Sequence, residues 1–143
     1  LWHMTRGEDS MISRAMSDGQ RPEFIWNEQW RERLGLPEMY KTKFHDLTPK
    51  DITSFPELDY SLVTEYRRNV RERTMKFLDG LKPEDLERCP HLRYEGDPRF
   101  GTIGRTLGHL VVDMSQHTGH VQYIKGLVKG MQNDIYEQKI SLH

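Results

Sequence analysis

The sequence predicts an all-α protein, a bundle of helices joined by one long crossover connection. Two observations lead to this fold class. Apolar residues recur three and four positions apart in separate segments, which is the spacing of one helix face. A long segment rich in turn-forming residues then connects the first part of the chain to the later helices. With 143 residues, the chain suits a single domain with one core.

The first predicted helix runs from Leu1 to about Ser17. An apolar stripe marks it: Leu1, Met4, Met11, Ile12 and Ala15. The stretch DGQRP ends it, because glycine and proline do not continue a helix well. Glu8 and Asp9 are interpreted as charges on the outer face of this helix, and a position behind metal ligands is the less favoured alternative.

A shorter helix is predicted over PEFIWNEQWRERLG, which opens with a proline suited to a first helical turn and stops at Gly35. We expect four apolar residues of this helix to be buried: Phe24, Ile25, Trp26 and Trp30. The two tryptophans either fill the core or line the mouth of a site, and the core is favoured. The following stretch LPEMYKTKFHDLTPKDITSFP has no sustained period and predicts a long connection that includes a turn of helix.

A long helix is predicted from about Pro56 to Leu81. Its stripe consists of Val63, Tyr66, Val70, Thr74, Phe77 and Leu81, while RRNVRER supplies a charged outer face. We expect this stripe to pack on the apolar stripe of the last long helix. Beyond it, KPEDLERCP predicts one capped turn and HLRYEGDPRFG an irregular segment.

The last long helix is predicted from about Thr102 to Gly130. Its apolar stripe consists of Leu107, Leu110, Met114, Val121, Ile124 and Val128. The bundle domain is therefore placed at residues 1–130 and a tail at residues 131–143. Three striped helices leave one side of a core open, so we expect either a helix before Leu1 or a second subunit, in a homodimer, to cover it.

Composition excludes several function classes. A formal net charge of −1 argues against a nucleic-acid binder, which normally carries a strong basic excess. No apolar run approaches the roughly 18 residues of a membrane span, and no signal-peptide pattern is present. Only one cysteine, Cys89, occurs, so no internal disulfide forms and a reducing, cytoplasmic compartment is expected.

Candidate metal ligands cluster in TLGHLVVDMSQHTGHVQYIKGLV. His109, Asp113, His117 and His120 fall within about a quarter of the helix circumference at 100° per residue. His117 takes a position in the apolar row itself, and Asp113 precedes it by one turn. A single histidine on such a face is usually an ordinary core residue, but this number of coordinating groups favours one wall of a metal site.

Two ligands hold a transition metal poorly, so a third is expected from another helix. His3, in LWHMTRGED, is the candidate, and a surface histidine at a frayed terminus is the alternative. Imidazole and carboxylate suit zinc, nickel, iron or manganese, and the order of affinities does not choose among them. Three protein ligands leave a position open for water, which is typical of a catalytic metal.

These residues together resemble the DinB-like superfamily of four-helix bundles. LWHMTRGED matches the histidine of the family's second helix, and HTGH matches the ending of the family's ligand pair. The resemblance makes His117 the second member of that pair and Asp113 the first, since one branch of the family carries an acidic residue there. His109 matches a histidine often seen one turn earlier. The resemblance covers Leu1 to about Gly130.

The resemblance implies an up-down-down-up bundle whose first helix would precede Leu1 or be replaced by a partner. It also implies a thiol-dependent metalloenzyme, an isomerase or S-transferase, with a divalent metal on His3, Asp113 and His117. His109 and His120 would then serve as supporting groups or proton acceptors. The alternative is a non-catalytic metal-binding or interaction bundle linked to stress response, because a shared bundle does not fix function.

Overall fold

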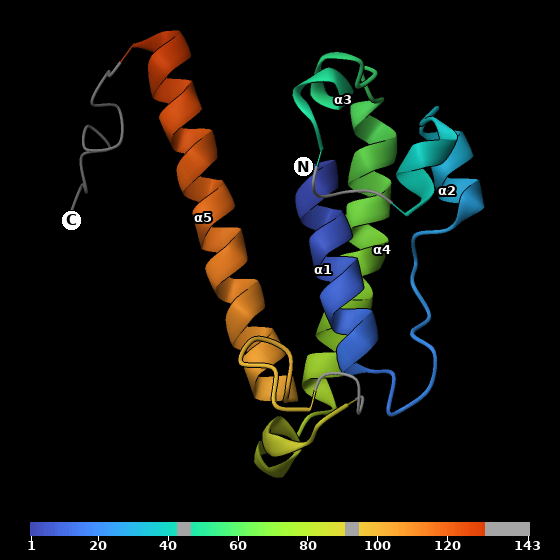
Figure 1. Ribbon diagram of the computed structural model, residues 1–143, viewed down its shortest axis with the longest axis vertical. Coiled ribbons are helices and arrows are strands. Elements are labelled where there is room, and N and C mark those ends of the chain that lie inside the picture. Colours follow the sequence, from blue (N-terminus) through green and yellow to red (C-terminus); the bar gives the residue numbers. More distant parts are fainter. Residues whose placement is uncertain (43–46, 91–94, 131–143) are drawn as a thin grey trace, which may run out of the picture. The chain divides into compact units, whose positions relative to one another are not determined.

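The computed structural model describes residues 1–42, 47–90 and 95–130, and over these residues it is all-helical (Figure 1). Its α-helices are α1 (Trp2–Ala15), α2 (Glu28–Arg33), α3 (Pro49–Thr53), α4 (Tyr60–Asp79) and α5 (Ile103–Lys129). Two 3₁₀ turns, η1 (Glu38–Lys41) and η2 (Pro83–Glu87), lie between them. The all-α prediction is therefore confirmed. The chain forms two compact units, Leu1–Val111 and Val112–His143, and each is described by itself.

The first unit is organised around α1 and α4, which lie side by side (Figure 1). The buried positions of α4 are Val63, Tyr66, Val70 and Thr74. Their spacing of three and four residues places them on one face of the helix, as the sequence predicts. Opposite them, Ile12 and Ala15 of α1 are fully buried. The stripe of α4 thus packs on α1 within this unit, whereas packing on the later part of α5 stays a prediction.

Aromatic rings fill the core between these helices and the connection that follows α1. Trp2 meets Trp26 edge to face with ring centroids 5.7 Å apart, and Trp26 meets Tyr66 at 5.5 Å. Trp30 packs on the same tyrosine, and Tyr40 of η1 packs on Trp2. All five rings are at least nine-tenths buried. Trp26 and Trp30 therefore belong to the core, as the favoured interpretation holds.

The second predicted helix is shorter than the sequence indicates. Only Glu28–Arg33 is helical, because the side chain of Asn27 accepts a hydrogen bond from Trp30 N and begins the helix there. The backbone before this helix is not helical, because the N–H groups of Ile25 and Trp26 donate hydrogen bonds to the carboxylate of Asp9. The expected burial of Phe24 is wrong, because 41% of this residue is exposed.

The connection of residues 36–56 contains η1 and α3, two short turns in place of the single one predicted. The long helix then begins at Tyr60 rather than Pro56, because the Asp59 carboxylate accepts a hydrogen bond from Ser61 N at 2.8 Å and caps it. Near its other end, Phe77 and Leu81 are only half-buried. Replacing a fully buried phenylalanine by alanine lowers the free energy of unfolding by about 3–5 kcal/mol. Because Phe77 is only half-buried, this figure does not apply to Phe77→Ala.

The start of α5 is anchored in the first unit. Ile103 N donates to Arg88 O at 3.0 Å, and Ile103, Thr106 and Leu110 are buried. A Cβ on Gly104 would lie 3.1 Å from the carbonyl oxygen of Leu86, so a larger residue would push this helix away from η2.

The C-terminal end of α5 lies where the sequence predicts it. Gly130, which has a φ of +80°, directly follows the last helical residue, Lys129. The predicted tail, residues 131–143, lies outside the described residues, as do residues 91–94 of the predicted irregular segment. No helix of the described ranges is long and apolar enough to cross a membrane.

Ile12 and Ile52 provide a matched test of this core. Ile12 is fully buried on α1, whereas 62% of Ile52 is exposed on α3. We expect Ile12→Ala to lower the free energy of unfolding by about 2–5 kcal/mol, because a cavity remains in a packed interior. Ile52→Ala should change it by about 0.5 kcal/mol or less. Urea denaturation followed by circular dichroism measures both, and equal losses would contradict the core assignment.

Candidate functional site

The predicted ligand pair lies in the second unit, on α5. The Nε2 atom of His117 and the Oδ1 atom of Asp113 are 3.7 Å apart, and about a quarter of each side chain is exposed. The two residues are one helical turn apart, so their side chains emerge on the same face. The structure thus places the carboxylate of Asp113 next to the imidazole of His117, and their role as metal ligands stays a prediction.

The donor atoms of the pair lie close to the spacing of two ligands of one metal. Two ligand bonds of about 2.1 Å that meet at a tetrahedral angle place their donor atoms about 3.4 Å apart. The observed 3.7 Å needs only a small side-chain adjustment to reach that value. An imidazole nitrogen and a carboxylate oxygen are also ligands that zinc and other transition metals accept. These two residues thus fit a divalent metal as two of its ligands.

The other two histidines of α5 occupy different surroundings. The ring of His120 lies 6.1 Å from the ring of His117, and its side chain is exposed. His109 is half-buried in the first unit, where its ring meets the ring of Phe100 edge to face at 5.1 Å. Of these two histidines, His120 is the one that lies near the Asp113–His117 pair.

His3 lies in the first turn of α1 and is half-buried. It belongs to the first unit, whereas Asp113 and His117 belong to the second. Among the described residues, no group of three or more histidine, cysteine, aspartate or glutamate side chains is gathered closely enough to hold a metal ion. The convergence of all three predicted ligands stays a prediction.

The interpretation of Glu8 and Asp9 as outer-face charges is wrong. Only 3% of Glu8 and none of Asp9 is exposed. The sequence contained a signal for this, since Trp2, Thr5, Asp9 and Ile12 are spaced by three, four and three residues and share one helix face. The predicted stripe consists of apolar residues only. Asp9 is charged, so the prediction assigns it to the outer face although it shares a helix face with buried residues.

Asp9 connects three parts of the first unit. Its carboxylate accepts hydrogen bonds from Ile25 N at 3.0 Å, from Trp26 N at 2.8 Å and from the hydroxyl of Tyr66 at 2.8 Å. It also accepts one from the guanidinium of Arg73 on α4. These donors occupy the lone pairs of both oxygens. A carboxylate so fully engaged holds structure together and has no free oxygen for a substrate or a metal.

Glu8 and Arg6 extend the same buried network. Glu8 accepts a hydrogen bond from the hydroxyl of Thr74 at 2.8 Å and pairs with Arg71 at 2.9 Å. The guanidinium of Arg6 lies over the ring of Trp26, 4.6 Å from its centroid. Burial lowers the pKa of Arg6 below its ordinary value, although nearby Tyr66 and the Asp9 carboxylate oppose that shift. Polar residues thus join α1 to α4 along much of their contact.

Comparison with known proteins gives no match: no family model, curated protein or solved structure is significantly similar to this chain.

Asp9→Asn tests the role of the buried carboxylate. The amide nitrogen would face hydrogen-bond donors, and Arg73 would lose its compensating charge, so we expect a loss of about 3–5 kcal/mol in the free energy of unfolding. Asp79→Asn is the matched control, because Asp79 is exposed at the end of α4, and it should change stability by about 0.5 kcal/mol or less. A mild loss in chemical denaturation of Asp9→Asn would contradict the network.

Tyr66 provides a test by pH. Burial, and then the neighbouring Asp9 carboxylate, raise the pKa of the Tyr66 phenol far above its usual value near 10. The unfolded chain releases this proton near pH 10 and the folded chain does not, so folding stability falls as pH rises above about 10. In a titration of phenolate absorbance, Tyr66→Phe should remove signal from the step that accompanies unfolding. Loss of signal from the reversible step near pH 10 would contradict the assignment.

Proposed function

We propose that the protein binds a divalent metal ion through Asp113, His117 and His3 and uses it in thiol-dependent chemistry. The observation that carries this proposal is the Asp113–His117 pair, whose donor atoms are 3.7 Å apart on one face of α5. Asp113 and His117 would hold the metal from α5, and His3 would complete the protein ligands from α1. Zinc or nickel is the favoured ion, with iron or manganese as alternatives.

The resemblance of HTGH and LWHMTRGED to DinB-like motifs supports the proposed chemistry. A divalent metal, when bound, lowers the pKa of a coordinated low-molecular-weight thiol. In the proposed reaction the thiol sulfur would bond to an electrophilic carbon while the leaving group departs with its electron pair. His120, whose ring is 6.1 Å from that of His117, would accept the thiol proton, and His109 would be a supporting group.

The proposal includes the assembly that such a site needs. The three ligands belong to two units, so in the proposed up-down-down-up bundle one metal would bind His3 of α1 together with Asp113 and His117 of α5. A further helix or a second copy of the chain would complete that bundle. The proposed setting is the cytoplasm, where thiols stay reduced.

A non-catalytic metal-binding or interaction bundle is the second candidate. It is favoured by the absence of a gathered three-ligand group among the described residues. In that case the Asp113–His117 pair would bind metal weakly or serve only as a helix-surface interaction.

Metal analysis of untagged protein tests the site directly. We expect about one divalent metal per chain in elemental analysis, lost in His117→Ala and in Asp113→Asn because each removes a primary ligand. Circular dichroism should show an unchanged total helix content in these variants. His120→Ala, one turn further along the same helix, is the matched control and should keep the metal. Equal metal content in His117→Ala and wild type would overturn the site.

Thiol dependence then separates the two functions. The metal-loaded protein should transfer glutathione, mycothiol or bacillithiol to a haloaromatic acceptor, whereas His120→Ala should retain metal and lose rate. Metal without turnover supports the non-catalytic candidate, and turnover of an ester without any thiol indicates a hydrolase instead.

A further inference from the structure

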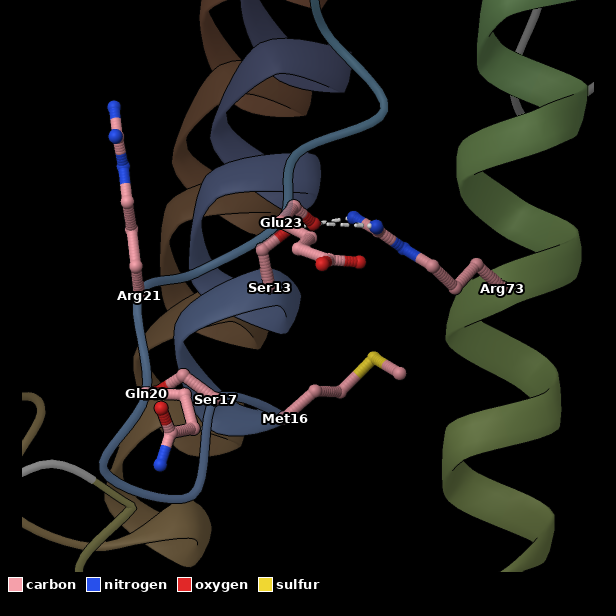
Figure 2. Close-up of a pocket in the computed structure, with 7 residues that line it drawn as sticks. All are labelled: Ser13, Met16, Ser17, Gln20, Arg21, Glu23 and Arg73. Carbon is pink, nitrogen blue, oxygen red and sulfur yellow. Dashed lines mark hydrogen bonds between the residues drawn. The ribbon is translucent and has the colours of Figure 1, made fainter.

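We draw no further inference here: the strongest candidate, the hollow of about 280 Å³ between the C-terminal end of α1 and Arg73 of α4 (Figure 2), carries none, because the guanidinium of Arg73 is already bonded to Asp9, Ser13 and the carbonyl oxygen of Glu23 and nothing in the structure shows what would occupy the space.

Discussion

The carboxylate of Asp9 is the group on which the first unit depends. It is completely buried, and burying a charge costs more than almost any other single event in folding unless partners replace the lost water. Those partners come from three places: the backbone at residues 25–26, the hydroxyl of Tyr66 and the guanidinium of Arg73. One side chain therefore fixes α4 and the connection to α2 against α1.

This constraint explains how the aromatic core is built. The N–H groups of Ile25 and Trp26 are held by Asp9, so the chain there is not helical, and α2 starts only after Asn27. Trp26 is thereby placed between Trp2 and Tyr66, with its indole N–H donating to Lys41 O at 3.1 Å. A polar contact thus determines where apolar rings pack, because backbone held by a buried charge has little freedom to shift.

The same network matters for the proposed chemistry. Asp9 and Glu8 tie α1 to α4 at two successive positions, through Tyr66 and Arg73 on one side and Thr74 and Arg71 on the other. His3 is carried by this restrained helix, and a ligand is presented most precisely from a rigid element. Asp113 and His117 are brought next to each other by their spacing along α5. In the proposed site, residues 1–111 would provide a firm support for His3, and α5 would present the other two ligands.

The sequence by itself determined what is local. Apolar spacing located α1, α4 and α5 to within a few residues, and the four-residue spacing of Asp113 and His117 placed them together, because helix periodicity depends on nothing beyond the helix. Tertiary structure decided the rest. Asp9 is buried because Tyr66 and Arg73, more than fifty residues away in the chain, supply its partners. The backbone before α2 is also fixed by a distant contact, because the N–H groups of Ile25 and Trp26 donate to Asp9, sixteen and seventeen residues earlier.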